Sequence, residues 1–198
     1  MAARTLLGIV GSVSADSRTR TAVEVALDAA EAHHSVETEL LHLADYDLAT
    51  ADGRGVDNHT GDTAEALERI AAADAYVVGT PVYRGSYSGA LKNLLDMVPR
   101  GGWQGDAAPF ENAAVGLVAT GASDHHFLAV DQELRPAFAF FGAHTVGGAT
   151  YASGDDFEDS ALVSDAVRER LATLGEATVE LATAIDESTA LAALGPAI

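Results

Sequence analysis

The chain has 198 residues, of which 48% are hydrophobic, and it contains no cysteine. This length can bury one substantial core, and the lack of cysteine excludes disulfides, thiolate nucleophiles and cysteine-ligated metal sites. The 30 acidic residues outnumber 11 basic ones, and the formal net charge of −19 would repel a phosphodiester backbone, which excludes nucleic acid as a partner.

The acidic residues are spread over nearly every polar segment, and Lys92 is the only lysine. This composition resembles that of proteins from salt-accumulating halophiles, in which ions screen self-repulsion; an ordinary acidic protein is the alternative. No apolar run approaches the ~20 residues of a membrane span, and the first residues lack the pattern of a signal peptide. We therefore expect a cytoplasmic protein that does not enter a membrane.

Apolar runs of strand length alternate with segments of helical period along the chain. The predicted strands are residues 4–12, 36–43, 75–80, 113–120 and 143–151. They mostly lack polar alternation, as expected of strands that are covered on both faces. The predicted apolar helix faces consist of Val23, Ala26, Leu27 and Ala30; Leu67, Ile70 and Ala71; Leu91, Leu94, Leu95 and Val98; and Phe127, Val130, Leu134, Phe138 and Phe141.

Two residues are expected to interrupt helices. Pro136 should bend the fourth helix, and the closing helix over residues 158–187 should break near Gly175. We find no repeat and no linker that would separate domains. The sequence thus predicts one domain over residues 1–187 and a weakly ordered tail over 188–198.

Strands that alternate with helices predict an α/β fold with a parallel sheet wound on both faces. In such sheets ligands bind beyond the carboxyl ends of the strands, where the strand order reverses. The loops that follow the first, third and fourth strands are therefore where a functional site is expected.

The first of these loops is GSVSADSRTRT, residues 11–21. Its hydroxyl groups, its two arginines and the free amides of a helix N-terminus suit a phosphate. It matches neither the Walker phosphate loop nor the dinucleotide-binding glycine motif, which favours a pocket for one terminal phosphate. The alternative is that Asp16 or Ser17 only caps the helix.

The second loop is GTPVYRGSYSGALKNLLD, residues 79–96. Pro81 is expected to fix a bend, and Gly85 would let the backbone approach a ligand closely. Tyr83 and Arg84 can lie against a flat ring, while the amides around Gly85 and Ser86 can donate hydrogen bonds to its edge. A phosphate at one loop and a flat ring at the next describe a mononucleotide; an ordinary Pro/Gly turn is the alternative.

These motifs also carry a family resemblance. GTPVYRGSYSGALKNLLDMV is similar to the flavin-ring loop of the NAD(P)H-dependent FMN reductases of the flavodoxin-like superfamily. GSVSADSRTRT resembles their phosphate loop, and residues 118–146 resemble their third flavin-side loop with the helix after it. The resemblance covers roughly residues 5–152 and is closest to the reductases that supply reduced FMN to two-component monooxygenases. It implies a three-layer α/β/α sandwich with a five-stranded parallel sheet of order 2-1-3-4-5.

The resemblance assigns roles to particular positions. Those expected to hold the FMN phosphate are Ser12, Ser14, Ser17, Arg18 and Thr19. Those expected to contact the isoalloxazine ring and ribityl chain are Pro81, Val82, Tyr83, Arg84, Gly85 and Ser86, with Tyr83, Arg84, Gly85 and Ser86 as the catalytic group beside N5. Those expected to approach the pyrimidine edge are Thr120, Gly121 and Ala122.

The expected activity is hydride transfer from NAD(P)H to N5 of FMN, which needs position and electrostatics more than an acid–base pair. Two alternatives stay open: a flavoenzyme that reduces quinones, azo compounds or metal oxyanions, and a flavodoxin-type electron carrier. The histidines share no spacing with carboxylates that would make a metal site. A homodimer or homotetramer is expected from the resemblance and from the apolar start of the third helix at Tyr87 and Leu91, with Lys92 near the subunit contact.

Overall fold

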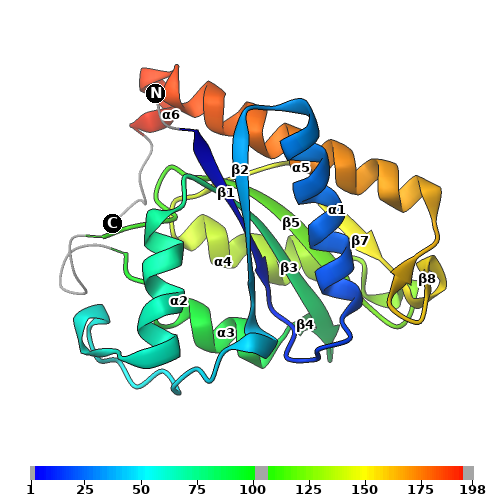
Figure 1. Ribbon diagram of the computed structural model, residues 1–198, viewed down its shortest axis with the longest axis horizontal. Helices are drawn as coiled ribbons and strands as arrows, with labels where there is room; N and C mark the ends of the chain where they lie inside the picture. The colour runs from blue at the N-terminus through cyan, green and yellow to red at the C-terminus, as the bar shows by residue number, and fades with distance from the viewer. Residues whose placement is uncertain (1–2, 101–106, 194–198) are drawn as a thin grey trace.

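The computed structural model describes residues 3–100 and 107–193 and shows a parallel sheet between two layers of helices (Figure 1). Its strands are β1 (Arg4–Val10), β2 (Val36–His42), β3 (Ala75–Tyr83), β5 (Ala114–Thr120), β6 (His144–Thr145) and β7 (Thr150–Ala152). The order is β2-β1-β3-β5-β6, and both β6 and β7 pair in parallel with β5. The predicted flavodoxin-like architecture is confirmed, except that the fifth strand is divided into two short pieces.

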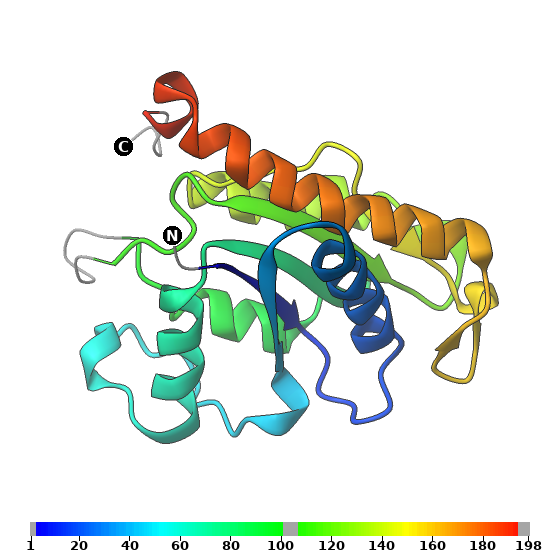
Figure 2. The ribbon, with the colours of Figure 1, turned by 45° about the horizontal axis from the view of Figure 1, so that its top comes forward.

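Helices cover both faces of this sheet. On one face lie α1 (Arg18–His33) and the long α5 (Asp165–Asp186), and Figure 2 shows α5 crossing the sheet beside α1. On the other face lie α2 (Gly61–Ala72), α3 (Gly89–Leu95) and α4 (Arg135–Phe140). No helix of the described part of the chain is long and apolar enough to cross a membrane.

Short elements complete the described part of the chain. They are the 3-10 turns Leu43–Asp45, Val56–Asn58, Asp124–His126 and Gly154–Asp156, the π-helical turn Val130–Leu134, the strands β4 (Ser86–Tyr87), β8 (Phe157–Glu158) and β9 (Ala161–Leu162), and α6 (Thr189–Ala192). β4 pairs with the end of β3, and β8 pairs with β9 in a separate hairpin.

Alternating side chains of the strands build two cores. In β1, Leu7 and Ile9 pack toward α2, α3 and α4, whereas Leu6 and Val10 pack toward α1 and α5. The predicted helix faces are buried, with two exceptions: Ala71 is exposed, and Phe127 is 58% exposed. Ala66 takes the place expected of Ala71, because it lies on the side of α2 that faces the sheet.

Gly175 does not break the closing helix, contrary to the prediction. α5 runs without interruption from Asp165 to Asp186, and Gly175 lies where this helix meets Ala26 of α1. A Cβ atom at Gly175 would lie 1.9 Å from the carbonyl oxygen of Ala26, so the glycine permits a close helix–helix contact. Residues from 158 onward were also expected to be helical, but they first form the β8–β9 hairpin.

Pro136 was expected to bend the interior of the fourth helix, but it lies at the start of α4. The segment before it is a π-helical turn, and Pro136 occupies the first turn of the α-helix that follows. A proline is tolerated there because the first amide groups of an α-helix have no intrahelical partner. The change of helix type therefore precedes the proline.

The predicted C-terminal tail, residues 188–198, contains a short helix near its start. α6 lies within it, and the chain near α6 is held by the Asn112 side-chain amide, which donates to the Ala192 carbonyl at 3.0 Å. The Nε2 atom of His144 lies 3.1 Å from the carbonyl oxygen of Leu191. Residues 194–198 of the predicted tail lie outside the described residues.

Candidate functional site

A cleft of about 340 Å³ lies at the carboxyl ends of β1, β3 and β5. It collects residues from the three loops singled out in the sequence. Its lining consists of Ser12, Ser14, Asp16, Ser17, Arg18 and Thr19 from the first loop, Pro81, Val82 and Tyr83 from the second, and Thr120, Gly121 and Ala122 from the third. Eleven of the 14 predicted binding residues therefore line one cleft, which also includes Asp16, and Arg84, Gly85 and Ser86 do not line it.

The first loop is shaped by its own hydroxyl groups. The Ser17 side chain is the N-cap of α1 and accepts a hydrogen bond from the Arg20 amide at 3.2 Å. The Ser12 hydroxyl accepts from the Ser14 amide at 3.2 Å, which curls the loop toward the helix. The amides of Arg18 and Thr19, in the first turn, have no acceptor within the helix. The capping role of Ser17 thus exists, and the same geometry leaves amide donors at the cleft.

Arg18 and Thr19 connect the first loop to distant segments. The Nε atom of Arg18 donates to the Asp159 carbonyl at 2.7 Å, and its guanidinium lies 5.7 Å from the centre of the Phe157 ring. The hydroxyls of Thr19 and Thr120 lie 2.6 Å apart and are buried. The first loop is therefore fastened both to the third loop and to the β8–β9 hairpin.

The second loop is a β-hairpin. β3 continues through Pro81 to Tyr83, and a two-residue turn at Arg84 and Gly85 leads into β4. Pro81 therefore does not fix a bend. It lies two residues after Gly79, which is the last residue of β3 that pairs with β1. No hydrogen bond to β1 is therefore lost because proline lacks an amide donor.

The turn itself depends on positive φ angles. Arg84 has φ of 56° and Gly85 has φ of 84°, the combination that a tight hairpin turn requires. Tyr83 is 61% exposed at the cleft, and the Ser86 hydroxyl donates to the Glu133 carboxylate at 3.1 Å. Val82 borders the cleft while its side chain packs into the core.

The third loop is held close to Tyr151. A Cβ atom at Gly121 would lie 2.0 Å from the Tyr151 hydroxyl oxygen, so any larger residue at this position would displace the Tyr151 ring. The Tyr151 hydroxyl donates to the Ser123 carbonyl at 2.5 Å, and burial raises the pKa of this phenol. The Gly121 amide donates to the Ala152 carbonyl at 3.0 Å. Tyr151 and β7 therefore fix the backbone of this loop at the cleft.

Comparison with known proteins matches residues 4–158 to the family model described as NADPH-dependent FMN reductase. The chain belongs to this FMN reductase family. It is 34% identical over 177 residues to an NAD(P)H-dependent FAD/FMN reductase of Geobacillus thermodenitrificans, covering 89% of this chain and 92% of the relative. It is 35% identical over 164 residues to the NADH-dependent FMN reductase SfnF of Pseudomonas putida, covering 82% of this chain and 84% of the relative.

Solved structures agree with this membership. The NADH:FMN oxidoreductase EMOB in its apo form superposes with a TM-score of 0.74 at 26% identity, over 98% of this chain and 95% of that chain. An oxidoreductase from Corynebacterium diphtheriae, at 24% identity, shares the fold with a TM-score of 0.72 over 96% of this chain and all of that one. The predicted enzyme class, an NAD(P)H-dependent FMN reductase that uses FMN, is confirmed by these findings.

The cleft suits the FMN of this family on its own chemistry. One end offers first-turn amides and serine hydroxyls, which are donors for a phosphate, and the other end offers an exposed aromatic ring beside backbone groups. Within residues 3–100 and 107–193, no group of three or more histidine or acidic side chains is placed to hold a metal ion.

Sequence reasoning missed one segment that lies beside the cleft in this FMN reductase. A Cβ atom at Gly154 would lie 2.8 Å from the Ala122 carbonyl oxygen and 3.4 Å from an Arg18 terminal nitrogen, so the segment after β7 adjoins both outer loops. Ser153 and Asp156 form a capping box at this segment. The Ser–Gly–Asp–Asp pattern of residues 153–156 was the available signal, but the sequence analysis assigned it to no element.

Proposed function

We propose that this protein reduces FMN with NAD(P)H in the cleft at the ends of β1, β3 and β5. The observation that carries the proposal is the convergence of three chemically distinct loops on one cleft of about 340 Å³, all within the family-matched region. When bound, FMN would supply the hydride acceptor at N5 of its ring.

Different residues of the cleft would bind the phosphate and the ring of FMN. The hydroxyl groups of the first loop and the amides at Arg18 and Thr19 would hold the phosphate, while Tyr83 would lie against the ring. These hydroxyl groups are those of Ser12, Ser14, Ser17 and Thr19. The Arg18 Nε atom is occupied by Asp159, which leaves the two terminal nitrogens of its guanidinium for the phosphate. The amides of the Arg84–Gly85 turn and the charge of Arg84 would stabilise negative charge on the reduced ring.

The direct experiment is to purify the protein in high salt, record its visible spectrum, and follow NADH and NADPH oxidation with and without added FMN. Oxidation that depends on FMN supports the proposal. Nicotinamide oxidation that proceeds only with quinones would favour the quinone reductase alternative, and no oxidation by a flavin-loaded protein would favour an electron carrier.

Replacing both Ser17 and Thr19 with alanine is expected to weaken FMN binding by about 10²-fold or more, because each hydrogen bond to a charged group contributes about 1.5–3 kcal/mol. Turnover at saturating FMN should largely survive, since both residues lie at the phosphate end. Flavin fluorescence titration gives the affinity, and steady-state NADH oxidation gives the turnover.

The matched control is Ser164→Ala, because Ser164 caps α5 as Ser17 caps α1 but lies away from the cleft. It should cost about 1 kcal/mol of stability and leave the affinity for FMN unchanged. Wild-type FMN affinity in the double variant would contradict the assignment of this loop to the phosphate.

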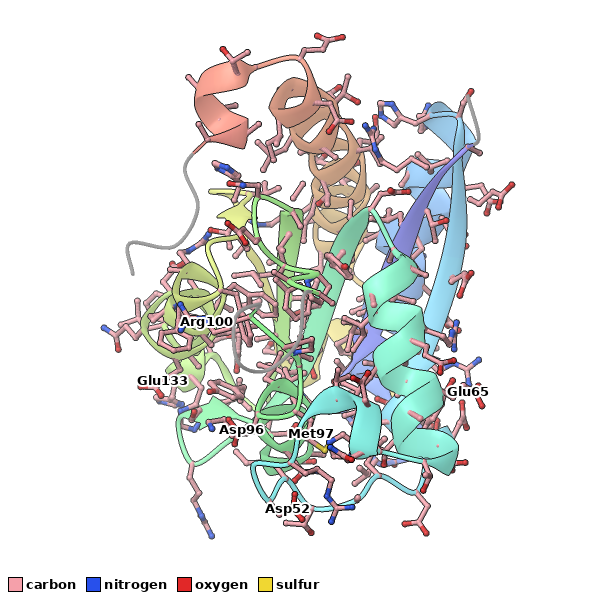
Figure 3. The ribbon with its side chains drawn as sticks, turned by 90° about the vertical axis from the view of Figure 1, so that its left-hand side faces the viewer. Asp52, Glu65, Asp96, Met97, Arg100 and Glu133 are labelled. Carbon is pink, nitrogen blue, oxygen red and sulfur yellow. The ribbon has the colours of Figure 1, made fainter. Side chains whose placement is uncertain are left out.

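We also propose that the protein forms a homo-oligomer through α4 and its neighbourhood. Phe127, Leu128 and Phe140 are large apolar side chains that are 58%, 45% and 56% exposed. A second cavity, of about 320 Å³, lies between α3 and α4. In its lining the guanidinium carbon of Arg100 lies 3.7 Å from the centre of the Phe140 ring. Arg100, Asp96 and Glu133 lie along one side of the molecule in Figure 3, opposite Glu65.

The sequence analysis based the subunit contact on Tyr87 and Leu91, and the structure excludes Leu91 from that role. Leu91 is completely buried and cannot reach a partner, whereas Tyr87 and Lys92 line the cavity. Lys92 is ion-paired with Asp96. The apolar surface available to a second copy therefore comes from α4 and the segment before it.

Light scattering in molar salt is expected to give a mass of two or four chains, and Phe127→Ser combined with Phe140→Ser is expected to reduce it to one. Val163→Ser is the control, because Val163 is an exposed apolar residue after β9. A wild-type monomer that is fully active would contradict this proposal. Delivery of reduced FMN to a flavin-dependent monooxygenase is a further proposal, which activity of the mixed proteins would test.

A further inference from the structure

His42 is a buried histidine beside the first loop. It is the last residue of β2 and pairs with Val10, the last residue of β1, after which the loop of residues 11–17 begins. In Figures 1 and 2 the end of β2 lies beside the connection from β1 to α1. Leu40, two residues earlier, packs into the core on the α1 side, so strand alternation directs His42 to the same side. His42 is only 2% exposed.

Neither ring nitrogen of His42 has a hydrogen-bond partner. A buried polar group without a partner is costly, and native proteins rarely retain one without a reason. The backbone of Ser14, which lines the cleft, lies close enough to the ring to favour its protonated form. The imidazole therefore adjoins the loop that would hold the phosphate.

The charges around His42 come from two elements. Asp45, in the turn after β2, and Glu24 of α1 favour a proton on the ring, whereas Arg20 of α1 opposes it. Arg20 and Glu24 form an ion pair at 2.8 Å, so Asp45 is the carboxylate left to balance a charged His42. Burial outweighs these charges and lowers the pKa of His42 below its ordinary value. The imidazole is therefore neutral near pH 7 when the loop holds no anion.

Of the two arginines of the first loop, Arg18 keeps the terminal nitrogens of its guanidinium for a phosphate, whereas the charge of Arg20 is balanced by a carboxylate. Arg18 donates to the carbonyl of Asp159, and Arg20 is paired with Glu24. In a chain with a net charge of −19, an incoming phosphate meets a repulsive field and gains from each additional cation nearby. His42 is a group beside the loop that can become such a cation.

We propose that His42 makes the first loop selective for a phosphorylated flavin, by taking up a proton from solvent when the phosphate binds. The inference rests on the proposed FMN-binding function and adds a residue to it. The ring stays behind the loop, and its charge acts on the phosphate through the backbone around Ser14. His42 is thus a positioning residue.

Linkage gives the sign of the effect. A bound phosphate raises the pKa of His42, so lowering the pH from about 8 to about 6.5 must strengthen FMN binding. The second ionisation of the phosphate, with a pKa of about 6, acts in the opposite direction, because protonation removes charge from the ligand. Riboflavin has no phosphate and should show neither effect.

The first experiment compares the affinities for FMN and riboflavin at about pH 8 and about pH 6.5. FMN should bind the wild-type protein about three- to tenfold more tightly at the lower pH, and riboflavin should bind equally at both. In His42→Gln, lowering the pH should no longer strengthen FMN binding. His59→Gln is the matched control, because His59 is also buried with both ring nitrogens unpartnered but lines a different cavity, beside α2. It should behave as wild type.

A second experiment needs no variant. Calorimetric titration of the wild-type protein in buffers of different ionisation enthalpy counts the protons exchanged near pH 7. Net proton uptake with FMN and none with riboflavin supports the proposal. Proton release or no exchange with FMN would overturn it, as would an unchanged pH dependence in a folded His42→Gln. If neither flavin binds, the proposed function fails and this inference fails with it.

Discussion

Gly175→Ala is expected to destabilise the protein by about 3 kcal/mol or more, a large part of the ~5–15 kcal/mol typical of a domain. The new Cβ atom would lie 1.9 Å from the Ala26 carbonyl oxygen and 2.7 Å from its carbonyl carbon. Both are backbone atoms, so no side-chain rotation relieves the contact and the two helices must separate. Urea unfolding followed by circular dichroism measures the loss.

The same substitution in another helix should have the opposite effect. Gly89 is exposed in the first turn of α3, and a Cβ atom there meets nothing within 4 Å. Gly89→Ala is therefore expected to be neutral or to stabilise the protein by up to about 1 kcal/mol. Equal unfolding midpoints for Gly175→Ala and the wild-type protein would mean that α1 and α5 do not pack this closely.

Gly85→Val is expected to abolish most of the reductase activity while the fold persists. A β-branched residue is strained at the φ of 84° that Gly85 adopts, at a cost of about 1–3 kcal/mol. The Arg84–Gly85 turn should change shape, and a displacement of about 1 Å at reacting groups can cost about 10²-fold in rate. FMN affinity and NADH oxidation at saturating FMN should both fall.

Gly53→Val is the control for backbone strain alone. Gly53 has φ of 82°, and a Cβ atom at Gly53 or at Gly85 meets nothing within 4 Å. Gly53 lies between β2 and α2 and not in the hairpin of β3 and β4, so this variant should lose similar stability and keep its activity. If Gly85→Val bound and reduced FMN normally, the hairpin tip would be only a turn, and the assignment of this loop to the ring would be wrong.

The sheet could be predicted from the sequence because its strands are apolar runs buried on both faces. The boundaries of β1, β2 and β5 lie within two residues of those expected. The fifth strand was less accurate, because the interruption between Thr145 and Thr150 lies within a segment of strand-like composition. Local composition does not reveal where a strand loses its partner.

The errors arose where tertiary contacts decide the local structure. Gly175 looks like a helix breaker by propensity, but its lack of a side chain serves the contact with Ala26. Pro81 looks like a bend, but it continues β3. The sequence could not show that Arg18 donates to the carbonyl of Asp159, because the two residues are 141 positions apart.

The site could be predicted to the level of loops rather than of individual contacts. The rule that ligands bind at the carboxyl ends of parallel strands led to the three segments that now share one cleft. It could not show that the hairpin tip at Arg84 extends beyond the cleft lining, or that Tyr151 supports Gly121. The roles of these residues toward FMN stay predictions.

Ser88 joins segments on two sides of the cleft. Its hydroxyl donates to the Gly11 carbonyl at 2.5 Å and accepts from the Leu91 amide at 3.0 Å. Its amide donates to the Thr80 hydroxyl at 3.0 Å, and both Thr80 and Ser88 are buried. Since this one residue fixes the start of the first loop against the end of β3 and α3, the cleft is preorganised before any ligand arrives. Flavin binding should then order few residues of the chain, and the conformational entropy lost on association should come mainly from the flexible ribityl chain of the flavin.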